Sequence, residues 1–466
     1  MTASNGSTPR PVIVTIETPS LGDRSYLAHD GVVAVVIDPQ RDIDRMLSVA
    51  AAAGVTIEHV FETHIHNDYV TGGFALAEQT GARYHVNAAD EVSFERSGIT
   101  DGDVVPVSDV MRIRAIATPG HTFTPLSYAL ESRPDPTAGF DPVAVFTGGS
   151  LLFGATGRPD LLGPGHTDAL GRHQHHSAHR RATELPDATE VLPTHGFGSF
   201  CSAGSTSEAD SSTIGQEQRD NPALTEDAAD WISRTLAGLD AYPAYYAHMG
   251  PANAIGPAAP DLSPPTVVDR DVLARRIDAG EWVVDLRNRT AFAAGHVTGS
   301  LNFGLDGQFS TYLGWLIPWG TSLTLLGDSA EQVAEAQREL VRIGVDELAG
   351  AASGAPEDWT DRPLGNFPRA TFLDLGQVRR HRPVQILDVR RTSEFETGHI
   401  EGAHSIPIHE LPTRLDEVPA GEVWVHCAGG YRASIAASFL PARGVPVVAV
   451  DDDFDPGARA ADLPLT

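Results

Sequence analysis

Cys427 stands where a predicted strand meets a predicted helix, and this placement suits a nucleophile. The strand covers residues 423–426, a short Gly-rich loop follows, and the helix includes residues 433–440. Backbone N–H groups at the start of a helix lack intrahelical partners and carry the positive end of the helix dipole, so they stabilise an anionic sulfur. The predicted anion cradle consists of Arg432 and the loop residues Ala428, Gly429, Gly430 and Tyr431.

A second group of residues with chemical potential is rich in histidine. His64 and His66 stand two apart at the end of a predicted strand, and His121 follows in a distant turn. Imidazole nitrogens are preferred ligands of zinc and iron, and three of them leave coordination positions open. His64 and His66 are therefore candidate metal ligands.

The elements that must position these residues alternate between strands and helices. In the first block, residues 32–37 and 60–63 read as strands and residues 42–53 as an amphipathic helix. Residues 202–221 are rich in Ser, Asp, Gln and Gly and lack apolar periodicity, which predicts a linker. Residues 226–239 then read as a helix.

The chain repeats itself after a proline-rich spacer. Six residues recur with a constant shift of 103 positions: Asp285, Arg287, Phe292, Gly295, His296 and Gly299 become Asp388, Arg390, Phe395, Gly398, His399 and Gly402. Apolar strands precede both aspartates, as a parallel sheet requires. Two copies of one α/β domain explain this pattern better than one large domain.

The second copy resembles the rhodanese, or sulfurtransferase, domain. The resemblance rests on Asp388-Val389-Arg390, on Gly398-His399-Ile400 and on the loop that begins at Cys427. Four residues separate Cys427 from Arg432, which is the loop length of the sulfurtransferases, whereas the related phosphatases have a longer loop. The resemblance implies that Cys427 takes sulfane sulfur from thiosulfate or a persulfide and carries it as a persulfide.

The first copy contains no cysteine, because none occurs between Cys201 and Cys427. The position that corresponds to the loop holds Gly327-Asp328-Ser329. We expect this copy to be inactive and to dock or orient its neighbours. Ser329 as a nucleophile is the alternative, but no paired base accompanies it in the sequence.

The first block resembles the metallo-β-lactamase fold family. Four runs carry the resemblance in the family's order: Thr63-His64-Ile65-His66-Asn67-Asp68-Tyr69, Thr118-Pro119-Gly120-His121, Phe146-Thr147-Gly148 and Pro193-Thr194-His195-Gly196. The resemblance implies a first metal site on His64, His66 and His121, and it makes Asp68 and His195 further candidate ligands. Two departures weaken a second metal site: Tyr69 replaces a histidine, and Gly149 replaces a bridging aspartate. We expect one metal at most, and Gly149→Asp should tighten its binding. Cys201 is expected to be a packed thiol.

Gly157-Arg158-Pro159-Asp160-Leu161 extends this resemblance to the persulfide dioxygenases. It implies one iron ion, rather than zinc, and the oxidation of glutathione persulfide to sulfite, with glutathione as co-substrate. The family's iron ligands carry over as His64 and His121, with no counterpart at Gly149. The vacant position is open to Asp68, Asp160, His166, His195 or water.

Two other functions stay open. One is a zinc hydrolase of the glyoxalase II kind, which acts on a glutathione thioester through metal-bound hydroxide. The other is a sulfur-carrier protein whose first domain is a metal-free scaffold and whose only chemistry lies at Cys427. One iron ion would favour the dioxygenase, two zinc ions the hydrolase and no metal the carrier.

The predicted fold is α/β and multidomain. Its parts are a metallo-β-lactamase αββα sandwich over residues 12–203, a linker and connecting helix over 204–263, and two rhodanese-like α/β domains with parallel sheets over 264–357 and 369–462. Only the last of these contains the catalytic cysteine.

The composition of the chain limits the classes of partner that it can bind. The formal net charge of -29 argues against nucleic acid and against anionic membrane surfaces. Partners are therefore expected to be small persulfide, thiosulfate or thiol substrates, and assembly with further copies of the chain is left open. No apolar run approaches the length of a membrane helix, and two cysteines suit a reducing compartment, so we expect a soluble, cytoplasmic protein.

Overall fold

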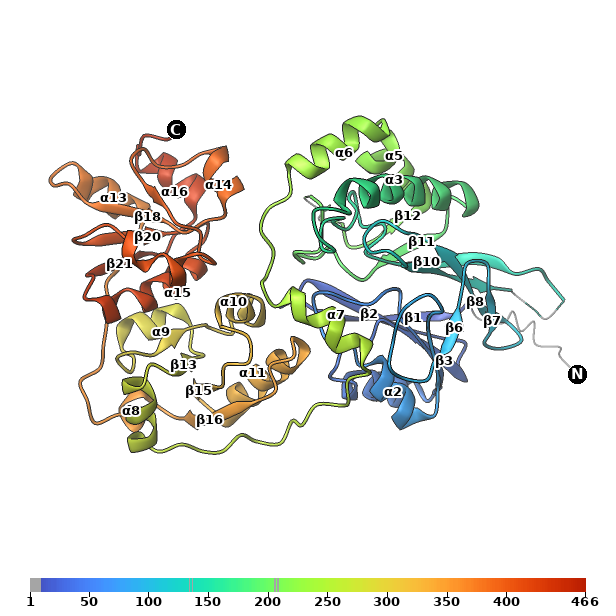
Figure 1. The fold of residues 1–466 in the computed structure, drawn as a ribbon, viewed down its shortest axis with the longest axis horizontal. Helices are drawn as coiled ribbons and strands as arrows, with labels where there is room; N and C mark the ends of the chain where they lie inside the picture. The colour runs from blue at the N-terminus through green and yellow to red at the C-terminus, as the bar shows by residue number, and fades with distance from the viewer. Residues whose placement is uncertain (1–9, 134, 136, 205–206, 208) are drawn as a thin grey trace, which may run out of the picture. The chain divides into compact units, whose positions relative to one another are not determined.

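The computed structural model describes residues 10–133, 135, 137–204, 207 and 209–466. The chain forms two compact units, Met1–Pro260 with Val341–Gly344, and Asp261–Leu340 with Val345–Thr466 (Figure 1). Among the described helices, none combines the length and the apolar character needed to cross a membrane.

The first unit is built on two six-stranded sheets. The first sheet contains, in order, β1 (Val12–Thr18), β2 (Asp23–His29), β3 (Val33–Ile37), β4 (Thr56–Phe61), β5 (Arg83–Asn87) and β6 (Ser97–Ile99). The second sheet contains, in order, β12 (Ser212–Thr213), β11 (Glu190–Pro193), β10 (Asp141–Gly148), β9 (Leu126–Ser132), β8 (Met111–Ala117) and β7 (Val104–Pro106). Both sheets mix parallel and antiparallel pairs.

The main core of this unit lies between the two sheets. Tyr26, Val35 and Phe61 from the first sheet share one apolar cluster with Ile113 and Phe146 from the second. Strand β8 shows why the sheets face each other, because its buried residues alternate with arginines that point away from the cluster. The buried face of each sheet therefore covers that of the other.

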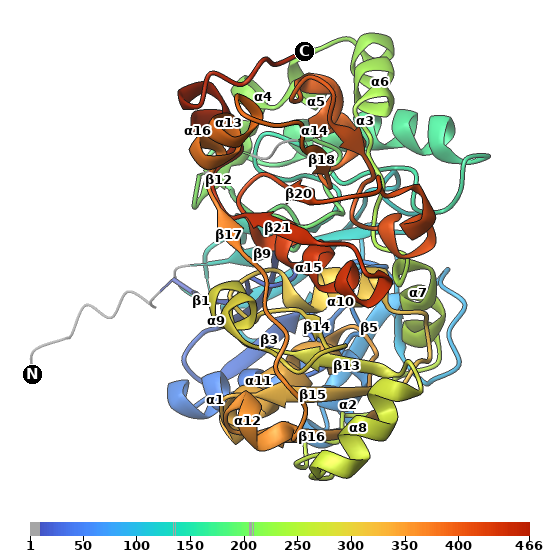
Figure 2. The same ribbon diagram turned by 90° about the vertical axis from the view of Figure 1, so that its left-hand side faces the viewer.

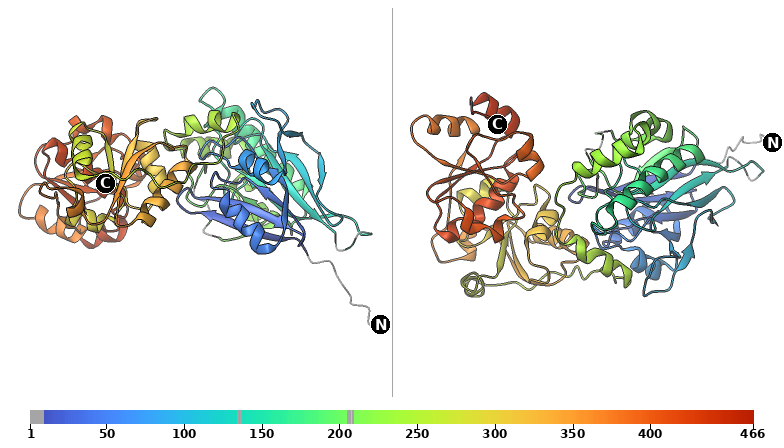
Figure 3. Two further views of the ribbon diagram at one scale, coloured as in Figure 1. Left: turned by 90° about the horizontal axis from the view of Figure 1, so that it is seen from below. Right: turned by 45° about the horizontal axis from the view of Figure 1, so that its top comes forward.

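Helices cover the outer faces of both sheets. The first sheet packs against α1 (Asp44–Ala53) and α2 (Gly73–Thr80). The second packs against α3 (Thr167–Glu184), α4 (Ile214–Asp220), α5 (Pro222–Thr225) and α6 (Ala228–Ala237), the green helices of Figure 3. The layers run helix, sheet, sheet, helix, so the predicted αββα sandwich is confirmed.

The linker predicted for residues 202–221 is wrong from Ser212 onward. Strand β12 pairs with β11 at the edge of the second sheet, and α4 follows at once. Ile214 and Trp231 are buried in the cluster beneath α3. The stretch looked like a linker because α4 buries only one short face, which leaves most of its residues polar. Helix α7 (Tyr246–Ala254) also belongs to this unit.

The second unit contains two parallel sheets (Figure 2). The first has the order β14 (Leu301–Asn302), β13 (Trp282–Asp285), β15 (Leu323–Gly327) and β16 (Leu348–Ser353). Its helices are α8 (Arg270–Asp278), α9 (Arg289–Ala294), α10 (Phe309–Leu316), α11 (Ala330–Arg342) and α12 (Pro356–Trp359). The prediction of parallel sheets is confirmed.

The last sheet has five strands. Their order is β17 (Arg369–Ala370), β21 (Val447–Val450), β20 (Val423–His426), β18 (Gln385–Asp388) and β19 (His404–Ser405). Its helices are α13 (Phe372–Arg379), α14 (Thr392–Thr397), α15 (Tyr431–Phe439) and α16 (Phe454–Ala460). Phe372 of α13 and Phe454 of α16 share one cluster on one side of this sheet.

The repeated residues make the same bonds in both copies. Arg287 binds Asp285 and donates to a glycine carbonyl 2.9 Å away, and Arg390 binds Asp388 and donates to the matching glycine carbonyl at 2.8 Å. These buried ion pairs close the turns that follow β13 and β18. The shift of 103 positions therefore reflects a repeat of structure as well as of sequence.

Candidate functional site

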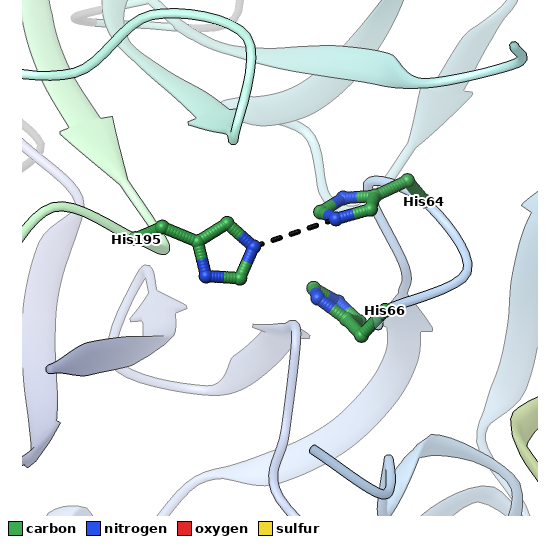
Figure 4. Close-up of side chains that lie close together, drawn as sticks. All are labelled: His64, His66 and His195. Atoms are coloured by element: carbon green, nitrogen blue, oxygen red, sulfur yellow. Dashed lines mark hydrogen bonds between the residues drawn. The ribbon is translucent and has the colours of Figure 1, made fainter. Parts of the chain in front are cut away.

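Four histidines of the first unit come together from three strand ends. His64 and His66 follow β4, His121 follows β8 and His195 follows β11. All four rings are buried, with at most 2% of each residue exposed. The ring centroid of His64 lies 4.1 Å from that of His66, 5.0 Å from that of His121 and 5.3 Å from that of His195. Figure 4 shows His195 pointing toward His64, with His66 beside them.

Hydrogen bonds decide which nitrogen of His64 and His121 faces the cluster. Thr63 Oγ1 donates its single proton to Asp38 Oδ2 at 2.7 Å, so it can only accept a bond from His64 Nδ1 at 2.9 Å. His121 Nδ1 donates to the carbonyl oxygen of Arg158 at 2.9 Å. Both rings thus carry their proton on Nδ1 and keep a lone pair on Nε2. Metal-binding histidines in proteins are held in the same way.

The protonation states agree with this assignment. Burial lowers the pKa of His64 well below its ordinary value, and the neighbouring imidazoles lower it further. Burial likewise lowers the pKa of His121 to about 3. His121 Nε2 is buried and has no hydrogen-bond partner. Neutral rings with free lone pairs are the form that binds metal.

His66 presents its other nitrogen to the cluster. Its Nε2 lies 3.3 Å from Asp38 Oδ1, 3.2 Å from Glu62 Oε2 and 3.0 Å from the Tyr69 hydroxyl. Burial lowers the pKa of His66, but the two carboxylates outweigh this effect and raise it to about 9. Nδ1 is buried without a partner, and a cation would bind it only by displacing the proton that this pKa leaves on the ring. Tyr69 therefore lies behind His66 and orients it.

His195 is held by two carboxylates. Its Nδ1 lies 2.9 Å from Asp23 Oδ1 and 2.9 Å from Asp68 Oδ2. Burial lowers the pKa of His195, but these carboxylates outweigh burial and raise it well above its ordinary value. Its Nε2 lies 3.4 Å from His64 Nε2. Two lone pairs at this distance repel each other unless a proton or a metal ion lies between them.

The ligand atoms of the cluster fall into overlapping groups. Within each group the atoms lie no more than 4.8 Å apart; one group contains His64, His66 and His195, and another contains His121, His195 and Cys201. His195 belongs to both groups, whereas no group among the described residues contains all three of the predicted ligands His64, His66 and His121. Asp68 reaches the cluster through its bond to His195. These residues fit one metal ion, because their ring nitrogens lie close together in buried space and two of them, His66 Nδ1 and His121 Nε2, have no hydrogen-bond partner.

Two other candidates lie elsewhere. Asp160 is bound by Arg158 at 2.7 Å, and His166 precedes α3 with its ring 5.0 Å from that of Phe123. Neither belongs to a ligand group among the residues that the structure describes. Gly149 lies against His121, so a Cβ at this position would stand 2.3 Å from Cδ2 of that ring.

Two partners of the histidines, Asp23 and Asp38, were not predicted from the sequence. Asp23 lies 172 positions before His195, in β2, and no motif surrounds it. Asp38 has φ of 50° directly after a buried strand, which is a constrained position for a non-glycine residue. That angle is itself visible only in the structure.

The second candidate site is the loop after β20. Cys427 follows β20 and is 2% exposed, and α15 begins at Tyr431. The backbone N–H of Gly430 donates to Cys427 Sγ at 3.1 Å. Gly430 has φ of 89°, and a Cβ there would stand 2.2 Å from an Asp451 carboxylate oxygen, so the loop requires glycine. The backbone therefore points the Gly430 N–H at the sulfur.

Arg432 is held beside this loop by an ion pair. Its guanidinium donates to Glu394 at 2.5 and 2.9 Å. Burial raises the pKa of Glu394, but Arg432 outweighs burial and lowers it to about 2. A cavity of about 800 Å³ opens next to the loop and is lined by Arg390, Glu394, Ala428, Asp453, Phe454 and Arg459, among others. A small substrate fits this volume.

The cysteine-free copy contacts the same loop. The Tyr431 hydroxyl donates to the Gly304 carbonyl at 2.8 Å, and Ser434 Oγ donates to Asn302 Oδ1 at 2.7 Å. Ser329 Oγ accepts the backbone N–H of Gln332 at 3.3 Å, so this hydroxyl caps α11. This geometry suits docking rather than catalysis.

Comparison with known proteins identifies both sites. Residues 374–456 match the family model of the rhodanese-like domain. The chain is 28% identical over 166 residues to hydroxyacylglutathione hydrolase of Nitrosococcus oceani, and 38% identical over 65 residues to the uncharacterized protein YqhL of Bacillus subtilis. These alignments cover 35% and 14% of the chain. The chain spans only about half the length of these relatives, 57% and 52%.

A solved structure resembles a larger part of the chain. The crystal structure of a metallo-β-lactamase from Staphylococcus aureus superposes with a TM-score of 0.65 at 27% identity, over 74% of this chain and 100% of that one. The chain joins a metallo-β-lactamase fold to a rhodanese-like domain. The histidine cluster belongs to the metallo-β-lactamase fold, and the rhodanese-like match includes Cys427 and Arg432.

Proposed function

We propose that the chain is a sulfurtransferase coupled to a persulfide dioxygenase. The rhodanese-like domain would carry sulfane sulfur on Cys427, and the metallo-β-lactamase fold would oxidise a persulfide, with glutathione as the carrier thiol. The observation that supports the first activity best is the bond from the Gly430 N–H to Cys427 Sγ at 3.1 Å. It gives an anionic sulfur, or a persulfide in its place, a fixed donor.

The proposed transfer has two steps. The Cys427 thiolate attacks the outer sulfur of thiosulfate, the S–S bond of the donor breaks, and sulfite leaves with the bonding electron pair. A nucleophilic acceptor, a thiolate or cyanide, then attacks the outer sulfur of the Cys427 persulfide and releases the Cys427 thiolate. Arg432, oriented by Glu394, supplies positive charge beside the anionic donor.

In the first unit, His64 Nε2, His66 Nδ1, His121 Nε2 and His195 Nε2 are the nitrogens that would hold the metal. An iron ion bound there would supply the redox chemistry that dioxygen needs to oxidise a persulfide. The chain's own residues fix the imidazoles: Asp38 and Glu62 hold His66, and Thr63 holds His64. The near-complete burial of the rings keeps bulk water from this site.

A glyoxalase II-like hydrolysis of glutathione thioesters is the second candidate, because relatives of the first unit are named hydroxyacylglutathione hydrolases. Gly149 disfavours a pair of bridged metal ions, since no side chain can reach into the site from that position. Metal content separates the candidates. One iron ion per chain supports the dioxygenase, whereas two zinc ions support the hydrolase.

The test of sulfur transfer is thiocyanate formation from thiosulfate and cyanide by the wild-type chain and by Cys427→Ser. The variant should lose the activity, because the other cysteine-bearing position, Cys201, is fully buried in the first unit. Equal rates would refute the proposed role. Oxygen consumption with glutathione persulfide tests the dioxygenase separately, and Cys427→Ser should retain it. Both cysteines are free, which suits the cytoplasm.

A further inference from the structure

Cys201 lies inside the histidine cluster. Its Sγ and one ring nitrogen each of His121 and His195 stand within 4.8 Å of one another. Donor atoms around a tetrahedral zinc or iron ion with one sulfur ligand are roughly 3.3 to 3.8 Å apart. The group therefore needs to contract by only about 1 Å to hold an ion.

The backbone fixes the position of this thiol. The Cys201 N–H donates to Ser199 Oγ at 3.2 Å, and its carbonyl accepts the N–H of Arg158 at 2.8 Å. The carbonyl of Arg158 in turn holds His121 Nδ1. One residue thus positions both the thiol and the imidazole of this group.

A second observation points to a ligand at the same place. His121 is fully buried, its Nδ1 is fixed by Arg158, and its Nε2 has no hydrogen-bond partner. A buried nitrogen without a partner costs free energy, so its retention indicates a group that binds it. A cation shared by His121, His195 and Cys201 would satisfy it.

An anionic ligand would stabilise a cation in this site. Burying a charge costs free energy unless an opposite charge or a ligand lies close to it. Gly149 cannot supply a carboxylate, because even a Cβ would collide with His121. Asp68 is bound through Oδ2 to His195 Nδ1, and Asp23 lies on the same nitrogen. A thiolate ligand would supply negative charge directly beside His121.

We propose that Cys201 is an anionic ligand of the metal ion in the first unit, together with His121 and His195. The cation would be a borderline-soft divalent ion such as zinc, cobalt or ferrous iron. The thiol proton leaves to solvent as the metal–sulfur bond forms. This inference rests on the proposed metal site, and it replaces the interpretation of Cys201 as a packed thiol.

The test uses the full chain with Cys427→Ser, in which Cys201 is the one remaining cysteine. The protein is loaded with cobalt(II) or zinc(II). X-ray absorption at the metal edge should then show one sulfur neighbour at about 2.3 Å, and the cobalt form should show a thiolate-to-metal charge-transfer absorption. Adding Cys201→Ser should remove both signals and weaken metal binding at least tenfold. Mutation of residues that only hold metal ligands in place already lowers metal affinity by about this factor.

The outcomes separate this inference from the proposed function. Metal bound with only nitrogen and oxygen neighbours would overturn the role of Cys201 and leave the dioxygenase proposal standing. A sulfur neighbour without oxygen consumption on glutathione persulfide would support Cys201 and refute the dioxygenase. No metal bound at all would refute both. The absorption measurement on Cys427→Ser does not depend on whether the Cys201→Ser chain folds.

Discussion

Replacing Glu394 with glutamine tests how the loop of Cys427 is held. Glu394 on α14 accepts two bonds from Arg432 at the start of α15, and Arg391 contacts the same carboxylate at 3.2 Å. The substitution keeps the shape of the side chain and removes its charge. We expect α15 and the loop before it to open more often.

The pKa of Glu394 shows how strongly its charged carboxylate stabilises the fold. Burial raises it, but Arg432 outweighs burial and lowers it from 4.5 to about 2. Since a tenfold change corresponds to about 1.4 kcal/mol, the charged carboxylate stabilises the fold by up to about 3 kcal/mol. Because the pKa is depressed in the fold, this contribution is present above pH 4.5 and is lost as the pH falls through about 2. It should not vary between pH 6 and 8.

Hydrogen exchange of the α15 amides measures local opening without requiring the multidomain chain to unfold in one step. Glu394→Gln should lower their protection by about two decades, equally at pH 6 and pH 8. The matched control is Glu396→Gln, an exposed glutamate on the same helix, which should change little. A loss below half a decade, or one that depends on pH in this range, would refute the reasoning.

Three further predictions concern the two sites. Gly149→Asp should lower metal occupancy, not raise it as the sequence suggested, because the Cβ of the new aspartate would collide with the His121 ring. Equilibrium dialysis measures the occupancy, and tighter binding would mean that the His121 ring moves aside. Elemental analysis should find at most one metal ion per wild-type chain, and replacing both His64 and His121 with alanine should abolish metal binding. Two ions in the wild type, or full occupancy in the variant, would show that the site is misplaced. Arg432→Ala should raise the KM for thiosulfate about ten- to hundredfold through loss of a charged contact; an unchanged KM would confine Arg432 to holding the loop.

Local sequence was sufficient to predict the elements of the sulfur-transfer loop. Strand, glycines, cysteine, arginine and helix are consecutive between residues 423 and 440, so their spacing alone brings the N–H groups to Cys427. The repeat of 103 positions likewise predicted two similar domains, because identical turns need identical residues. The linker over 202–221 was wrong after Ser212, since a short strand at a sheet edge is recognised only by its partner β11.

By itself, the sequence determined the fold class, the parallel sheets and the histidines that could bind metal. Tertiary structure decided which nitrogen each ring presents and which residues lie behind it. Asp23 and His195 are 172 positions apart, and Cys201 meets His121 only because β8 and β11 lie in one sheet. Hydrogen bonds that fix a tautomer depend on distances of a few ångströms between distant segments. Such distances are set by packing of the two sheets, and no local pattern encodes them.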